Sequence, residues 1–150
     1  MLDALTQETI AGLSIRRRII ALVEARLDLL APDREALRRA LAILANPLNA
    51  PRAARLAWRA ADAMWRAAGD VATDLNHYSK RATLTAVYGS TLLVFLDDES
   101  EGQADARAFL ARRVEDVMRF EKAKARLSGA AGGERLSLSR FIGRLRYPAI

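Results

Sequence analysis

The sequence predicts an all-α protein, and its composition and its hydrophobic periodicity both point to helices. The 150 residues are 51% hydrophobic and contain only 8 glycines and 4 prolines. Alanine, leucine and arginine dominate, and these residues favour helix. Apolar side chains also recur at three- and four-residue spacing along several runs, as expected of amphipathic helices. We therefore expect a helical bundle over residues 1–127, a flexible linker over 128–134 and a short amphipathic helix over 135–150.

Local signals set the boundaries of the predicted helices. Pro32 suits the first turn of a helix, and Asn46-Pro47 ends that helix. Gly69 can adopt the left-handed conformation that terminates the next one. The helix that follows is the most apolar and is expected to occupy the centre of the bundle. The predicted helices span residues 10–30, 32–45, 51–68, 74–96 and 103–127.

The end of the chain combines a glycine-rich segment with a basic amphipathic pattern. Small residues and three glycines over 128–133 predict the flexible linker. Beyond it, an apolar stripe at i, i+3, i+4 and i+7 is accompanied by arginines, a pattern typical of helices that dock on anionic membranes. A tail packed on the bundle or on a second subunit is the alternative. The predicted membrane-binding residues are Leu138, Arg140, Phe141, Ile142, Arg144, Leu145 and Arg146.

Composition excludes several kinds of site. The chain has no cysteine and one histidine, so we expect no disulfide, no metal site and no cofactor. No run reaches the roughly 18 apolar residues that span a bilayer, and the N-terminus lacks the pattern of a secretory signal, so a cytoplasmic location is expected.

The net charge of +6 favours anionic partners. Because the arginines are dispersed and no helix-turn-helix headpiece precedes the first long helix, we do not expect nucleic acid among them.

The run from Trp65 to Arg81 carries the most unusual group of residues. Its structural interpretation is a helix junction in which Asp70 and its neighbours cap free amides while Lys80 and Arg81 join a salt-bridge network. Its functional interpretation is a recognition surface, because the adjacent side chains at positions 77 and 78 point to different sides of a helix. No nucleophile, phosphate loop or metal-ligand spacing accompanies the run, so no catalytic residue is predicted.

A series of identities in and after this run matches a family motif: Trp65, Ala68, Gly69, Asp70, Thr73, Asp74, Asn76, Tyr78, Lys80, Arg81 and Leu84. On these residues the chain resembles the Coq-nine family of ubiquinone-biosynthesis accessory proteins. The resemblance extends over most of the chain from about Ile15 onward. Leu75 and His77 depart from the pattern, since the family has Phe and often Trp at these positions.

The resemblance implies a fold like the ligand-binding and dimerisation domain of TetR regulators, with a hydrophobic pocket for a quinone or isoprenoid lipid. The implied lipid-binding residues are Trp58, Leu84, Val87, Tyr88, Thr91, Leu92 and Phe95, and the alternative for this apolar interior is an ordinary packed core. It also implies a surface patch that engages the di-iron hydroxylase acting late in ubiquinone synthesis. The implied partner-binding residues are Asp62, Met64, His77, Tyr78 and Arg81, although Met64 is equally well explained as a core side chain.

Taken together, these features predict a non-catalytic ubiquinone-biosynthesis accessory protein. It would form a homodimer, hold a quinone or isoprenoid lipid, dock on the surface of the inner membrane and present the lipid to a hydroxylase. The alternative is a TetR-like ligand-binding or dimerisation module without a membrane role, whose tail docks on its partner subunit.

Overall fold

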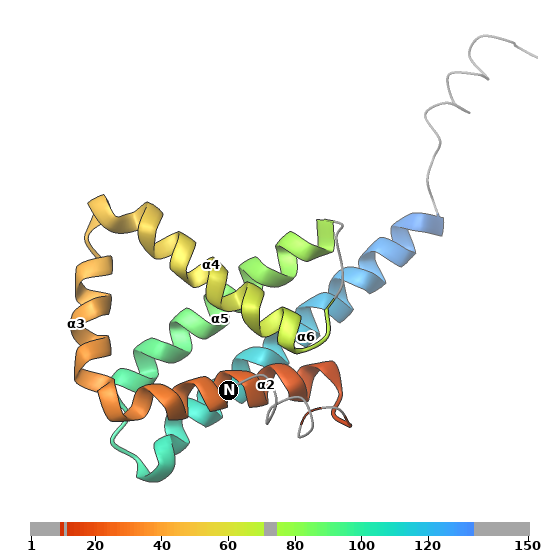
Figure 1. The fold of residues 1–150 in the computed structure, drawn as a ribbon. Coiled ribbons are helices and arrows are strands. Elements are labelled where there is room, and N and C mark those ends of the chain that lie inside the picture. The colour runs from red at the N-terminus through yellow and green to blue at the C-terminus, as the bar shows by residue number, and fades with distance from the viewer. Residues whose placement is uncertain (1–9, 11, 71–74, 134–150) are drawn as a thin grey trace, which may run out of the picture. The chain divides into compact units, whose positions relative to one another are not determined.

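The computed structural model describes residue 10 and residues 12–70 and 75–133, and its regular elements are all helical (Figure 1). The α-helices are α2 (Ile15–Leu30), α3 (Arg34–Leu44), α4 (Ala50–Ala67), α5 (Leu75–Asp97) and α6 (Ala104–Gly133). Three short 3-10 helices join them: η1 (Ala31–Asp33), η2 (Pro47–Asn49) and η3 (Glu101–Gln103). The predicted all-α helical bundle is confirmed.

Proline and asparagine set the turn between α3 and α4, as the sequence indicates. Pro47 occupies the first position of η2, where its missing N–H costs nothing. The side chain of Asn46 accepts a hydrogen bond from the N–H of Leu48 at 3.0 Å. The amide of Asn49 donates to the carbonyl of Ile43 at 2.8 Å. These side-chain bonds occupy backbone groups that a helix end leaves unpaired, so the turn has one defined geometry.

The core is centred on α5, which confirms the expected place of this helix. Its buried side chains include Leu84, Val87, Tyr88, Thr91, Leu92 and Phe95. The hydroxyl of Thr91 donates to the carbonyl of Val87 at 2.7 Å, so the polar atom of this fully buried residue has a partner within its own helix.

Small side chains line the face of α4 that packs against α5. Ala60 and Ala61 are buried there, together with Met64. Because the distance between two packed helices depends on the side chains between them, alanines allow α4 to approach α5 closely. Polar side chains near the end of α4 and the beginning of α5 can therefore contact one another.

The loop between α5 and α6 is organised by the buried carboxylate of Asp98. One oxygen accepts from the N–H of Ser100 and the other from the N–H of Ala106, each at 2.8 Å. Burial alone would raise the pKa of Asp98, but these hydrogen bonds and the one from the Ser100 hydroxyl outweigh it, and the pKa is lowered. Arg34 of α3 donates to the Asp98 carbonyl at 2.6 Å and so ties the loop to the bundle.

The predicted linker is the clearest difference from the sequence-based expectation. The structure continues α6 to Gly133, so residues 128–133, predicted to be flexible, are helical. Extending an existing helix requires no new nucleation, and Ala130 and Ala131 favour it, which offsets the cost of the glycines. The predicted membrane-binding helix over 135–150 lies outside the described residues.

The chain divides into two units, residues 1–115 and residues 116–150. The first unit contains α2 to α5 and the beginning of α6. Among the described helices, none is both long enough and apolar enough to cross a membrane.

Gly69 ends α4 in the left-handed conformation that the sequence predicts, with φ at +89°. The N–H of Gly69 donates to the carbonyl of Arg66, and the N–H of Asp70 donates to that of Trp65, both at 3.0 Å. This pair of bonds is the Schellman motif, which occupies carbonyls at the end of a helix. Arg18 of α2 adds a third bond, from its guanidinium to the Ala68 carbonyl at 3.2 Å. The end of α4 is thus fixed from two sides.

We expect Gly69→Ala to lower the free energy of unfolding by about 1–2 kcal/mol, because a Cβ disfavours a positive φ. Gly89 provides a matched control, since it lies inside α5 and a Cβ there would meet nothing within 4 Å. Gly89→Ala should raise stability by about 0.5–1 kcal/mol. Urea denaturation followed by circular dichroism measures both changes. Equal effects of the two substitutions would contradict the conformational role of Gly69.

Candidate functional site

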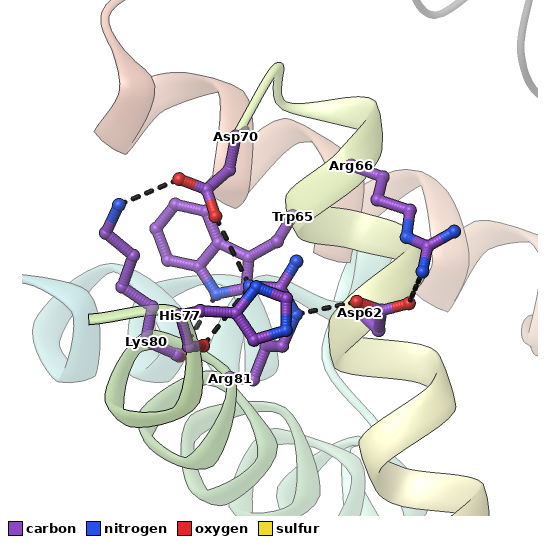
Figure 2. A network of polar contacts seen from close by, with 7 residues as sticks. All are labelled: Asp62, Trp65, Arg66, Asp70, His77, Lys80 and Arg81. Carbon is purple, nitrogen blue, oxygen red and sulfur yellow. Dashed lines mark hydrogen bonds and ion pairs between the residues drawn. The ribbon is translucent and has the colours of Figure 1, made fainter. Parts of the chain in front are cut away.

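A buried arginine links the end of α4 to the beginning of α5. Arg81 is only 2% exposed, and its Nε donates to Asp62 Oδ1 at 2.6 Å (Figure 2). One terminal nitrogen of its guanidinium donates to Asp70 Oδ2 at 3.3 Å and to the His77 carbonyl at 3.2 Å. A guanidinium has several donors in fixed positions, so one side chain can hold α4, the residue after Gly69 and the first turn of α5 together.

Lys80 and Trp65 form a second connection across the same junction. The Lys80 ammonium donates to Asp70 Oδ1 at 2.8 Å, and the Trp65 indole N–H donates to the Lys80 carbonyl at 3.0 Å. The ammonium also lies 5.4 Å from the centre of the Trp65 ring, within the range of a cation–π contact. The expected salt-bridge network of Lys80 and Arg81 is therefore present, and the carboxylate of Asp70 is one of its members.

Both carboxylates of this network are held in their charged form. The hydrogen bond from Arg81 lowers the pKa of Asp62 below its ordinary value of 3.8, against the opposing effect of burial. The hydrogen bond from Lys80 lowers the pKa of Asp70 in the same way, with a further contribution from Arg81. Since both acids are charged and bonded to cations, this arrangement is suited to structure and recognition more than to proton transfer.

An aromatic pair lies on the outer side of the junction. Tyr78 is 60% exposed, and its ring stacks on that of Trp58 of α4 with centroids 6.1 Å apart. The imidazole of His77, which is partly exposed, meets the Tyr78 ring edge-on at 5.1 Å. Neighbouring rings restrict the rotamers of Tyr78, so this exposed side chain is held in place by its contacts.

The predicted partner-binding residues thus divide by exposure. Tyr78 and His77 reach the surface, and Asp62 is partly exposed while bonded to Arg81 and Arg66. Arg81 is buried within the network. Met64 is 5% exposed, which fits the alternative of a core side chain.

Six of the seven predicted lipid-binding residues lie in the core of α5, and Trp58 is partly exposed. The sequence did not predict the polar partner of Tyr88, which is Arg26. The Nε of Arg26 in α2 donates a hydrogen bond to the Tyr88 hydroxyl at 2.7 Å. The guanidinium carbon of Arg26 lies 5.5 Å from the centre of the Tyr88 ring. Burial raises the pKa of Tyr88, so its hydroxyl stays neutral. A single arginine in an amphipathic helix gives no signal in the sequence that it will reach a tyrosine 62 positions away.

The described residues contain no cluster of histidine and acidic side chains that could hold a metal ion. The predicted membrane-binding residues lie outside the described part of the chain.

The chain is similar to known proteins over a region that includes the junction of α4 and α5. The COQ9 family model matches residues 50–121, from the start of α4 into α6. The mitochondrial ubiquinone biosynthesis protein COQ9 of Homo sapiens is 45% identical over 96 residues, which cover 64% of this chain and 30% of the human protein. The COQ9 protein of Rattus norvegicus is 43% identical over 96 residues, which cover 64% of this chain and 31% of the rat protein. The probable COQ9 protein of Dictyostelium discoideum is 27% identical over 140 residues, covering 93% of this chain and 45% of that protein. The chain thus spans less than half the length of these relatives.

We expect Arg81→Met to lower the free energy of unfolding by about 3 kcal/mol, because it leaves Asp62 and Asp70 charged without their common partner. Arg81→Lys should also destabilise the protein, since a single ammonium cannot reproduce the fork that reaches both acids. Arg16→Met is the matched control: Arg16 pairs with Glu115 at 2.5 Å near the surface. This exposed pair should contribute at most about 1 kcal/mol. Chemical denaturation of the three variants measures the difference, and equal losses for Arg81→Met and Arg16→Met would contradict the role of Arg81.

The same network predicts a loss of stability in acid. The folded pKa values of Asp62 and Asp70 lie below the ordinary value of 3.8, so their contribution is complete above that pH and is lost as the pH falls through the lowered values. Asp62→Asn/Asp70→Asn should therefore lose less stability than the wild type between neutral pH and about pH 3. Urea denaturation across this range measures both slopes. Equal losses would show that other carboxylates, such as Asp98, account for the acid sensitivity.

Proposed function

Since the chain belongs to the COQ9 family, we propose that it takes part in ubiquinone biosynthesis as an accessory protein that performs no catalysis itself. In this proposal it binds a quinone or isoprenoid lipid, associates peripherally with a membrane and presents the lipid to a hydroxylase of the pathway. Support comes from the relatives, which are named as ubiquinone biosynthesis proteins. The observation that carries the proposal is the junction of α4 and α5, where Asp70, Lys80 and Arg81 of the family motif form one ion-pair network and Tyr78 of the same motif is 60% exposed.

The hydroxylase would bind at the aromatic surface formed by Trp58, His77 and Tyr78. Tyrosine and tryptophan are the side chains that most often dominate protein interfaces, because they bury a large area at a small entropic cost. The contacts between these three rings reduce that cost further, since Tyr78 is already ordered. Arg81 follows His77 and Tyr78 on α5 and donates to the His77 carbonyl, so its network would maintain the shape of this surface.

The lipid would be held by the apolar interior around α5. Leu84, Val87, Leu92 and Phe95 provide the apolar contacts that an isoprenoid chain requires. The Tyr88 hydroxyl and the partly buried Arg26 guanidinium, which are bonded to each other, would provide the polar atoms. An apolar site with a small number of placed polar groups suits a ligand that has a long hydrocarbon chain and a quinone or phenol head.

Membrane association would use the amphipathic segment at the end of the chain. The apolar side chains that would enter the interface are Leu138, Phe141, Ile142 and Leu145. Each arginine would contribute about 1 kcal/mol of binding free energy by contact with anionic headgroups.

The rival function is a TetR-like ligand-binding or dimerisation module in which the same segment docks on a second subunit. Vesicle flotation of the chain with and without residues 135–150 separates the two.

Native mass spectrometry of the purified chain, followed by organic extraction, tests the lipid-binding role. We expect a quinone or isoprenoid to accompany the protein or to be taken up from vesicles that contain quinone. Phe95→Trp, which adds bulk to a fully buried position, should reduce this uptake, whereas Leu93→Trp on the exposed side of α5 should not. A chain that stays empty under both conditions would contradict the carrier function.

Tyr78→Ala is expected to weaken binding to the hydroxylase by about tenfold or more, as truncation of an aromatic anchor typically does. Leu93→Ala is the matched control, since Leu93 is 62% exposed on the same helix but lies outside the aromatic surface. Biolayer interferometry with the purified hydroxylase measures both affinities, and circular dichroism checks that both variants fold. An unchanged affinity for Tyr78→Ala would remove this surface from the proposal.

A further inference from the structure

The turn between α3 and α4 exposes large apolar side chains that the bundle does not cover. Leu48 at its tip is 88% exposed and Ile43 is 64% exposed. The helix α3 contains no buried residue, and its inward side chains Leu37 and Leu41 are only partly covered. The hydrogen bonds of Asn46 and Asn49 fix the turn, so Leu48 is held outward by an ordered structure.

The same region is strongly basic. Between residues 36 and 61 the sequence has five arginines and no acidic residue; Arg38 and Arg39 form ion pairs with Glu35 and Asp97, and the other three arginines lie on α4. On α4, Arg52, Arg55 and Arg59 follow one another at i, i+3 and i+7, so they share one exposed face with Leu56. None of these three arginines has an acidic side chain within 4 Å in the described part of the chain. Their charges are therefore available to an external anion.

We propose that this basic corner, formed by Ile43, Leu48, Arg52, Arg55, Leu56 and Arg59, docks on the surface of an anionic lipid bilayer. Leu48 and Ile43 enter the interface, and the arginines of α4 lie at the level of the lipid phosphates. Apolar side chains at the tip of a turn with arginines behind them match the two layers of a membrane surface, headgroups outside and hydrocarbon within. This inference shares the membrane partner of the proposed function but uses a surface on the bundle itself.

Charge argues against the other occupants of this corner. A second copy of the chain would bring the same arginines against one another. The segment over 135–150 is also rich in arginine and has no acidic residue, so it would be repelled. A nucleic acid would satisfy the arginines, but it would leave Leu48 and Ile43 without an apolar partner. An anionic bilayer satisfies both kinds of side chain.

Flotation of the full chain with vesicles tests the proposal. The vesicles consist of phosphatidylcholine alone or of an equimolar mixture with phosphatidylglycerol. Arg52→Gln/Arg55→Gln/Arg59→Gln and Ile43→Ser/Leu48→Ser should each reduce binding to the anionic vesicles by about tenfold or more. The substituted side chains are all exposed, so both variants should fold.

A charge-matched control separates this surface from the net charge. Arg17→Gln/Arg112→Gln/Lys122→Gln removes the same number of positive charges from exposed positions elsewhere. Because this variant leaves the basic corner intact and changes only the net charge, it should bind anionic vesicles within about twofold of the wild type. Equal loss in both triple variants, or no loss in the Arg52 variant, would overturn the proposal. So would a change in oligomeric mass caused by Ile43→Ser/Leu48→Ser, since the corner would then belong to a second copy.

A fluorescent label gives direct evidence of insertion. The chain has no cysteine, so Leu48→Cys carries a single nitrobenzoxadiazole label. Its emission should shift to shorter wavelength and increase on addition of the anionic vesicles. The same label on Leu93→Cys, an equally apolar exposed position of α5, should not respond. No response at position 48 would overturn the proposal.

Variants of the C-terminal segment distinguish this inference from the proposed function. If Phe141→Ser/Ile142→Ser abolishes flotation and the corner variants do not, the membrane role remains and the basic corner has no part in it. If the corner variants lose binding while Phe141→Ser/Ile142→Ser does not, the corner is the membrane contact and the tail is not. Losses in both sets would show that the two surfaces act together.

Discussion

The pairing of the buried Arg81 guanidinium with Asp62 and Asp70 is the constraint on which the rest of the structure depends. A buried cation is costly unless its donors meet acceptors, and here the acceptors come from α4, from the residue after Gly69 and from the first turn of α5. A shift of one helix along the other would separate the guanidinium from at least one of these acceptors. The position of Tyr78 on the surface follows from the same arrangement.

The sequence predicts best those helix boundaries that have a local chemical cause. Proline at the start of η2, asparagine before it and glycine after α4 all act locally, and the structure places them as expected. The central place of α5 follows from its apolar spacing. The predicted network of Lys80 and Arg81 is also present. Its acids were harder to assign, because Asp70 could equally have capped a helix, and only the fold decides which cation it meets.

Two kinds of feature could not be predicted from the sequence: contacts between residues far apart in the chain, and the conformation of segments with weak helix propensity. The contact of Arg26 with Tyr88 depends on how α2 lies against α5, and no local pattern encodes it. Residues 128–133 illustrate a different limit. Glycine-rich composition disfavours helix on average, yet a helix that already exists can continue through such residues when alanines are among them. The proposed lipid, hydroxylase and membrane contacts belong to neither case, since they concern molecules outside the chain.

The carboxylate of Asp98 has a consequence for how sequences of this kind can vary. Its two oxygens bind backbone N–H groups six residues apart, at Ser100 and Ala106. An inserted or deleted residue between these positions would move one of the amides away, and the buried charge would lose the hydrogen bond from that amide. Loops normally tolerate changes of length better than changes in helices, but this one does not have that freedom. The acidic residue therefore fixes the length of the connection between α5 and α6, and substitutions should accumulate in this loop where insertions do not.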